Sequence, residues 1–180
     1  MKKLLTILML VGFSFQAFSQ EDKFEGPSQT AKGKVAIDVN TTLGSIGGVL
    51  GGSGTSFLLS SSEGSTIYNF GAEVGIFAAN NMAFKLGFAY GDFDGFNLFS
   101  YKLGLKYYII SRIPFQIDFN GQAGKEIYGD EKAAYIGLQA GYAIFIGDMV
   151  SLEPSFRYNI SMNDNFENIF QIQMGFSIFF

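Results

Sequence analysis

The sequence contains no cysteine and no histidine among its 180 residues. Without cysteine, the fold forms no disulfide bond and carries no lipid-modified cysteine anchor. Without histidine, a serine nucleophile assisted by histidine is excluded. Metal sites are restricted to oxygen ligands for the same reasons. These two absences remove most of the common catalytic and metal-binding chemistries.

Charged residues are also scarce, because they make up 16% of the sequence where about 25% is usual. Hydrophobic residues reach 48%, and the chain has 21 Phe, 9 Tyr and 23 Gly. Beyond an apolar run near the N-terminus, no segment approaches the length of a membrane-spanning helix. The hydrophobic residues must therefore be distributed in another way.

Residues 1–19 have the three regions of a secretory signal peptide in the expected order. Lys2 and Lys3 precede an apolar run from Leu4 to Phe13, which is too short to cross a bilayer as a helix. The small-residue pattern Ala17-Phe18-Ser19 follows, and we expect cleavage after Ser19.

Residues 20–33 are polar and include a proline, which predicts a flexible periplasmic leader before a single domain at 34–180. After loss of Lys2 and Lys3, 10 Lys and Arg remain against 16 Asp and Glu, a net charge of −6. This charge argues against nucleic acid as a partner.

Apolar and polar residues alternate with a period of two through almost all of residues 34–180, which predicts β-strands. Gly, Asn, Asp and Ser separate the alternating segments, as expected at strand ends. We predict eight strands, at about 34–45, 66–78, 82–91, 96–109, 115–125, 134–146, 150–162 and 168–180.

Each predicted strand has one large apolar face and one small, polar or charged face. In a soluble barrel the apolar face points inward, whereas in a membrane barrel it faces lipid. The alternation alone does not choose between them. The polar faces carry four acids and four bases: Asp38, Glu73, Lys85, Lys102, Lys106, Asp118, Glu153 and Arg157.

Three features favour the membrane barrel. Short connections at 79–81, 111–114 and 147–149 alternate with longer, glycine-rich or acidic ones, as in outer-membrane barrels. The balanced charges suit a closed interior, where buried charges must be paired, and each base would be costly in lipid. Aromatic residues gather near strand ends on the apolar face, at Tyr68, Phe70, Phe84, Phe88, Tyr90, Phe99, Tyr101, Phe115, Phe176 and Phe180.

The interior charges are predicted to form ion pairs. Arg157 is expected to pair with a carboxylate from a neighbouring strand, either Asp118 or Glu153. An eight-stranded barrel is just wide enough to be filled by its own side chains, so we expect no general porin activity.

The last predicted strand carries Gln173, Gly175, Ile178 and Phe180 at fixed spacing. Outer-membrane barrels share such a closing pattern, which their barrel-assembly machinery recognises. Residues 34–180 resemble the small eight-stranded outer-membrane β-barrels, similar to the OmpA membrane domain and OmpX-type proteins. The resemblance implies an all-β, antiparallel up-and-down barrel in contact with outer-membrane lipid and lipopolysaccharide. We expect no peptidoglycan-binding domain after Phe180.

The enzymes that the fold class includes rely on histidine, so we expect a non-enzymatic barrel without cofactor or metal. The acidic segments at 91–95 and 163–167 are weak calcium candidates without a full EF-hand loop. The Gly/Ser stretch at 44–65 lacks a phosphate-loop signature and is predicted to form the first extracellular loop.

Two functions remain open at this point. The first is a structural or interaction barrel that displays its loops for envelope integrity or adhesion, with an unknown loop partner. The second is a narrow barrel that transports or binds small hydrophobic molecules, as OmpW-like proteins are thought to do. The second function requires an apolar path through the interior, which the predicted interior charges oppose.

Overall fold

The structure is a computed structural model that describes residues 28–46, 57–62, 65–93, 95–124 and 133–180. The predicted signal peptide lies outside the described residues. A 3-10 turn, η1 (Ser28–Thr30), precedes ten strands. The strands are β1 (Val35–Ile46), β2 (Leu58–Ser62), β3 (Ser65–Ala79), β4 (Met82–Phe93), β5 (Phe96–Ile109), β6 (Ile113–Ala123), β7 (Ala133–Gly141), β8 (Ile144–Ile146), β9 (Val150–Ser161) and β10 (Ile169–Phe179). Within these ranges, no helix has the length and apolar character needed to cross a bilayer.

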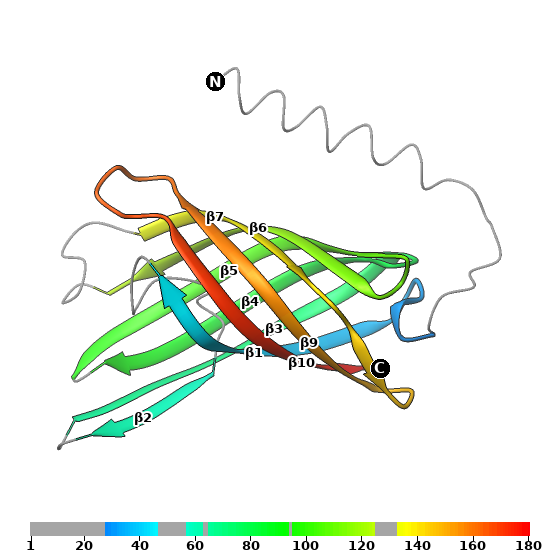
Figure 1. Ribbon diagram of the computed structural model, residues 1–180, viewed down its shortest axis with the longest axis horizontal. Helices are drawn as coiled ribbons and strands as arrows, with labels where there is room; N and C mark the ends of the chain where they lie inside the picture. Colours follow the sequence, from blue (N-terminus) through cyan, green and yellow to red (C-terminus); the bar gives the residue numbers. More distant parts are fainter. Residues whose placement is uncertain (1–27, 47–56, 63–64, 94, 125–132) are drawn as a thin grey trace.

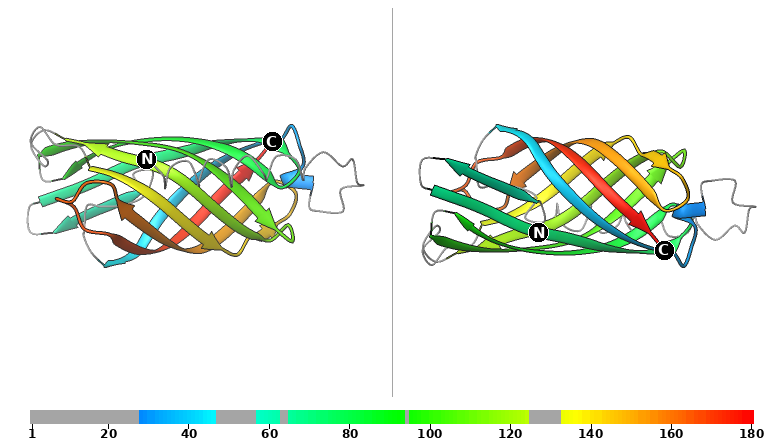
Figure 2. Two further views of the ribbon diagram at one scale, coloured as in Figure 1. Left: turned by 90° about the horizontal axis from the view of Figure 1, so that it is seen from above. Right: turned by 90° about the horizontal axis from the view of Figure 1, so that it is seen from below.

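All ten strands belong to one antiparallel sheet that closes into a barrel (Figures 1 and 2). The strand order is β1-β10-β9-β7-β6-β5-β4-β3-β2, and an additional pairing of β1 with β3 closes the circle. β7 and β8 both pair with β9, so they are two parts of one wall strand. β2 pairs only with the outer part of β3. The wall therefore has eight strands, which confirms the predicted fold.

The predicted segments agree with the wall strands to within two residues at each end. The agreement follows from the sharp alternation, because a strand with one apolar face has only one register in a closed barrel. Two details were not predicted as such. The Gly/Ser stretch contributes β2, and the sixth wall strand is interrupted at Tyr142 and Ala143, where the Ala143 amide donates to the Arg112 carbonyl instead.

The barrel is polar inside and apolar outside. In β4, for example, Phe84, Leu86 and Phe88 are 44–52% exposed, whereas Lys85 between them is 1% exposed. The same alternation continues around the wall, which leaves a continuous outer belt of large apolar side chains. Soluble proteins rarely expose a contiguous apolar surface of this extent, because its contact with water is unfavourable. The belt therefore matches a lipid environment. The structure thereby decides which face of each strand points outward.

The two ends of the barrel differ. The turn end carries the short connections at 80–81, 110–112 and 147–149, together with residues 28–34 and Phe180. The loop end carries the last residues of β1, β4, β6 and β9, and strands β2 and the start of β3 lie there as well (Figure 1). This arrangement agrees with the predicted alternation of short and long connections.

Residues 28–33, the last part of the predicted leader, pack against the turn end. The Asn81 amide donates to the Thr30 carbonyl at 2.7 Å, and the Gly33 amide donates to the Phe77 carbonyl at 2.8 Å. Gln29 and Thr30 are buried, and the Gln29 side chain donates to the Gly147 carbonyl. The leader ends in an ordered cap because its polar groups match turn carbonyls and amides, which composition alone does not reveal.

One seam of the wall is short. β1 pairs with β3 only over Val35–Asp38, whereas it pairs with β10 along its full length. Beyond Asp38, the Phe57 amide donates to the Asn40 carbonyl at 2.6 Å, so the chain entering β2 lies between β1 and β3. β1 and β3 therefore separate in the half of the barrel nearer the loop end.

Candidate functional site

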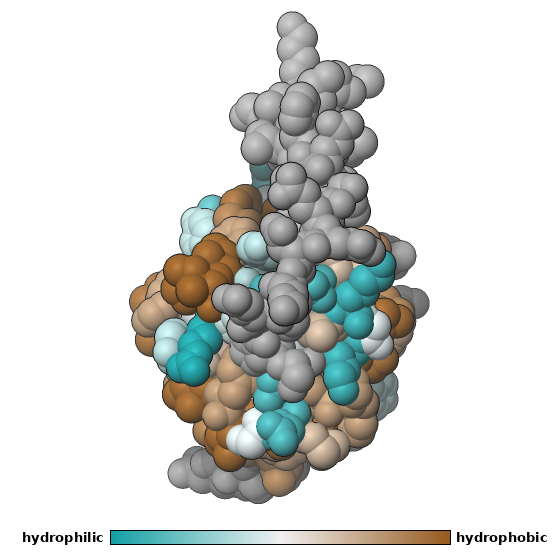
Figure 3. Space-filling model, turned by 90° about the vertical axis from the view of Figure 1, so that its right-hand side faces the viewer, coloured by the Kyte–Doolittle hydropathy of each residue, from teal (hydrophilic) through white to brown (hydrophobic). Residues whose placement is uncertain are grey.

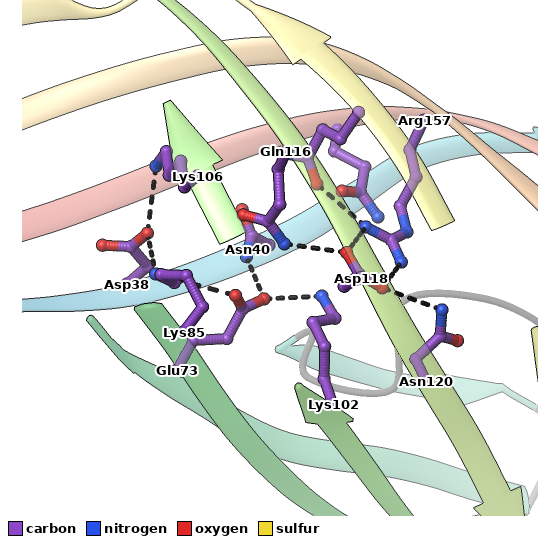
Figure 4. Close-up of polar contacts among 12 residues, drawn as sticks. Asp38, Asn40, Glu73, Lys85, Lys102, Lys106, Gln116, Asp118, Asn120 and Arg157 are labelled. Atoms are coloured by element: carbon purple, nitrogen blue, oxygen red, sulfur yellow. Dashed lines mark hydrogen bonds and ion pairs between the residues drawn. The ribbon is translucent and has the colours of Figure 1, made fainter. Parts of the chain in front are cut away.

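All eight predicted charged residues lie inside the barrel, and none is more than 4% exposed. They come from β1, β3, β4, β5, β6 and β9, and the pleat of each strand directs them to the axis. The close-up in Figure 4, which labels all of them except Glu153, shows how they converge. The interior is neutral overall, because Asp38, Glu73, Asp118 and Glu153 balance Lys85, Lys102, Lys106 and Arg157.

Six of these charges form a continuous chain of alternating sign along the interior. Lys106 bridges Glu153 at 2.5 Å and Asp38 at 3.0 Å. Lys85 contacts Asp38 and lies 3.6 Å from Glu73, which in turn pairs with Lys102 at 2.6 Å. Each of the three acids in this chain contacts at least one ammonium group. The pairing offsets part of the large cost of removing these charges from water.

Arg157 and Asp118 form a second cluster nearer the loop end. The guanidinium donates to both carboxylate oxygens of Asp118, with Nη1–Oδ2 at 2.8 Å and Nη2–Oδ1 at 2.6 Å. It also donates to the side chains of Gln139 at 3.2 Å and Asn159 at 3.0 Å. Such a two-pronged contact is the strongest form of a protein ion pair. Arg157 is fully buried.

The expectation that Arg157 pairs with a neighbouring strand is corrected by this geometry. Asp118 is its partner, but β6 and β9 are separated by β7. Gly137 of β7 lies between them, and a Cβ there would approach Arg157 Nη2 to 2.0 Å and Asp118 Oδ1 to 2.6 Å. Only a residue without a side chain lets the pair form across the intervening strand. Glu153, the other predicted partner, contacts Lys106 instead.

Neutral polar residues complete both clusters, and the charge-based reasoning missed them. The Tyr108 hydroxyl donates to Glu153 Oε1 at 2.8 Å, and Gln116 and Asn120 each donate to Asp118 at 2.9 Å. The alternation of the sequence places all three on the polar face of their strands. These three residues would have been found by listing every amide and hydroxyl side chain that lies on the same face of its strand as the charged residues.

Two clusters of apolar side chains, the apolar plugs, lie inside the barrel, one toward each end. At the turn end, six buried residues pack together, with Phe145 against them: Ala36, Phe77, Ala83, Tyr108, Ala143 and Phe179. Nearer the loop end, Ala133, Tyr135 and Ile169 form a smaller cluster with Phe166. The charged chain thus lies between two apolar layers, and the cap at 28–33 covers the first of them. The charged residues between the two plugs are at most 4% exposed.

The predicted assembly residues lie in the closing strand. β10 is hydrogen-bonded between β1 and β9. Gln173 and Gly175 are buried on its inner face, whereas Ile178 is half-buried and Phe180, just after the strand, is 54% exposed on the outside. Their side chains follow the pleat, and their role in assembly stays a prediction.

The described residues contain no cluster of three His, Cys, Asp or Glu side chains able to hold a metal ion. In the weak candidate at 91–95, residue 94 lies outside the described residues. In the segment at 163–167, the Asn163 side chain accepts from the Asn165 amide, which is a local turn contact. Neither segment carries a metal-site argument.

A closed eight-stranded barrel with an apolar exterior and an ion-paired interior is now established. The chain has the fold of a small outer-membrane-type β-barrel. Its sequence matches no protein-family model, and no curated protein is significantly similar to it. The fold assignment rests on the strand pairing and on the inverted polarity.

Solved structures show similarity to this barrel at low sequence identity. The N-terminal β-barrel domain of Pseudomonas aeruginosa OprF is 13% identical, with a TM-score of 0.48 over 83% of this chain and 98% of that chain. Neisserial surface protein A (NspA) is 14% identical, with a TM-score of 0.46 over 81% of this chain and 95% of that chain. A de novo designed transmembrane β-barrel is 6% identical, with a TM-score of 0.49 over 85% of this chain and 100% of that chain.

Proposed function

We propose that this protein is a non-enzymatic β-barrel of the outer membrane of a Gram-negative bacterium, exported through a cleaved signal peptide. The barrel presents the connections of its loop end at the cell surface and serves envelope integrity, adhesion or another interaction. The observation that carries the proposal is an interior filled by a neutral, ion-paired network beneath an apolar belt. Such a barrel anchors loops in a membrane and leaves no wide aqueous path.

The filled interior predicts that the protein is not a general porin. The two apolar plugs and the charged chain between them obstruct ions and solutes along the axis. Purified protein in planar bilayers is expected to show no wide, stable conductance. Persistent conductance of porin size would contradict the filled interior and with it the proposal.

The apolar belt supports membrane residence, and two measurements test this part separately. The protein is expected to fractionate with outer membranes. A closed barrel should also resist SDS at room temperature, so boiled and unboiled samples should migrate differently on gels. A protein found in the soluble fraction with identical migration of both samples would instead be a soluble barrel.

The absence of enzyme activity is supported by the chemistry of the interior. Each of the four buried acids contacts Lys or Arg, and the sequence has no histidine to activate a hydroxyl nucleophile. Incubation with lipid A or phospholipid, followed by mass analysis, is expected to return the lipids unchanged. Turnover of either lipid would refute this part of the proposal.

The lipid and protein partners follow from the same location. The belt would contact outer-membrane lipid and lipopolysaccharide, and the barrel-assembly machinery would recognise β10 through Gln173, Gly175, Ile178 and Phe180. The outward position of Phe180 suits this role, since an exposed aromatic side chain is accessible to a second protein.

A transport or binding barrel for small hydrophobic molecules is the second candidate, and the short β1–β3 seam favours it. Separation of β1 from β3 beyond Asp38 is where a sideways path through the wall would lie. The buried charges beneath the seam oppose an apolar path. Proteoliposomes loaded with a hydrophobic fluorophore distinguish the two candidates, because only the transport barrel would accelerate exchange of the fluorophore.

A further inference from the structure

The turn between β5 and β6 departs from ordinary turn chemistry. The Arg112 amide donates to the Ile109 carbonyl at 3.2 Å, and both central residues have positive φ, 50° at Ile110 and 58° at Ser111. Turns of this kind favour Asn and Gly, because a β-branched side chain is strained at positive φ. The β3–β4 turn follows this rule with Asn81 at φ 64°. Strain that persists at Ile110 points to a role for its side chain.

Ile110 is also the most exposed large apolar side chain in the described part of the chain, at 83%. It continues the outer belt, because Ile109 and Ile113 pair directly as the last rung of β5 and β6. The Ala143 amide, just before β8, donates to the Arg112 carbonyl, so β8 begins beside this turn and adds further outward apolar side chains. Together they form a rim patch of Ile109, Ile110, Ile113, Ile144, Ile146 and Met149, each at least 40% exposed.

Positive charge gathers at the same end of the barrel. Of the seven Lys and Arg residues that the structure describes, four lie inside, and the other three are the exposed Lys32, Lys34 and Arg112 at the turn end. These three, the rim cations, form no ion pair with any described acid. The loop end carries the opposite charge, with the described acids Asp92, Asp164 and Glu167 and no described base. Asp148 is the single described exposed acid at the turn end.

We propose that the turn end is a binding surface for anionic phospholipid. The rim patch enters the acyl region of the adjacent leaflet, and the rim cations bind the phosphate groups of the lipid headgroups at the surface of that leaflet. The occupant follows from continuity, because the rim patch is an uninterrupted extension of the lipid-facing belt. It also follows from charge, because basic side chains next to an apolar surface attract anionic headgroups. Figure 3 views this end, where brown apolar surface reaches the rim and teal polar groups lie between.

This inference rests on the proposed membrane location, so the experiment separates the two. The chain has no tryptophan, so each engineered Trp is the only one present. Ile110→Trp reports the rim patch, and Leu103→Trp, at a site 60% exposed in the middle of β5, reports the belt. Asp164→Trp, at an exposed site of the loop end, reports water. The variants are reconstituted in phosphatidylcholine vesicles that contain lipids brominated at shallow or deep acyl positions.

We expect shallow bromines to quench Trp at position 110, deep bromines to quench Trp at position 103, and neither to quench Trp at position 164. Quenching at 103 without quenching at 110 would overturn the present inference alone, and would assign the rim patch to a protein partner. Absence of quenching at 103 would overturn the proposed membrane location itself. Unboiled SDS gels establish beforehand that each variant is folded.

The headgroup preference is tested by native mass spectrometry in mixed micelles of phosphatidylglycerol and phosphatidylcholine. The triple variant Lys32→Gln, Lys34→Gln, Arg112→Gln is compared with the charge-preserving Lys32→Arg, Lys34→Arg, Arg112→Lys. Each cation is expected to favour bound phosphatidylglycerol by about fivefold, so the Gln variant loses the preference and the charge-preserving variant keeps it. Equal phosphatidylglycerol binding by both variants would refute the role of the rim cations.

Discussion

Replacing Arg157 tests the ion-paired interior most directly. Arg157→Ala removes four hydrogen bonds donated by the guanidinium, of which the two to Asp118 join opposite charges. It leaves the Asp118 carboxylate buried, with Gln116 and Asn120 as neutral donors but without its cation. Loss of one partner of a buried ion pair costs about 3–5 kcal/mol, so the free energy of unfolding should fall by that amount.

The double-mutant cycle gives the prediction its sharper form. Asp118→Ala alone should be similarly destabilising, because it leaves Arg157 as the unpaired buried charge. The double variant Arg157→Ala, Asp118→Ala buries neither charge, so its cost should be smaller than the sum of the single costs by about 1–3 kcal/mol. Urea unfolding in lipid vesicles, followed by the shift between folded and unfolded bands on unboiled gels, measures all three.

Arg112→Ala is the matched control, because it removes the same side chain at an exposed site of the turn end. Its effect in vesicles without anionic lipid should stay within about 0.5 kcal/mol of wild type. The reasoning would be refuted if Arg157→Ala were as mild as Arg112→Ala. Strict additivity of the two interior substitutions would refute the pairing as well.

The remaining predictions concern packing and assembly. Gly137→Ala should lower stability by about 1–3 kcal/mol, because its Cβ would meet the Arg157–Asp118 pair, whereas Gly44→Ala, with nothing within 4 Å, should be nearly neutral. Urea midpoints compare the two, and equal midpoints would mean that the pair does not need the space. Phe180→Ala should reduce the assembled fraction in cells more than Phe170→Ala, an equivalent outward change at the other end of β10. Heat-dependent gel migration of membrane fractions measures both, and equal assembly would remove Phe180 from the assembly signal.

Strand positions and strand number followed from the sequence because alternation is a local signal. A strand such as 150–162 carries its apolar and polar residues in strict succession, and the observed β9 begins at the same residue. The charged residues on the polar faces were identified by the same signal. By contrast, the cap at 28–33 and the strand β2 depend on contacts with distant turns and strands, which leave no periodic trace in the sequence.

The partners of the interior charges needed the closed barrel. The sequence left Asp118 and Glu153 as alternative partners of Arg157. It did not reveal that Gly137, which has no side chain, leaves room for the Arg157–Asp118 pair to form across β7. Lys85 and Lys106 converge on Asp38 from strands that are far from β1 in sequence. Such contacts depend on strand tilt and register around the whole wall.

The sequence by itself determined that this chain forms eight two-faced strands, since the period of two appears in each segment independently of the others. It also determined the set of charges on their polar faces. Only the tertiary structure decided that these faces point inward, which carboxylate meets which base, and where the rim patch and rim cations lie. Those outcomes depend on closure of the sheet, which brings together side chains separated by tens of residues and fixes which surface remains for lipid.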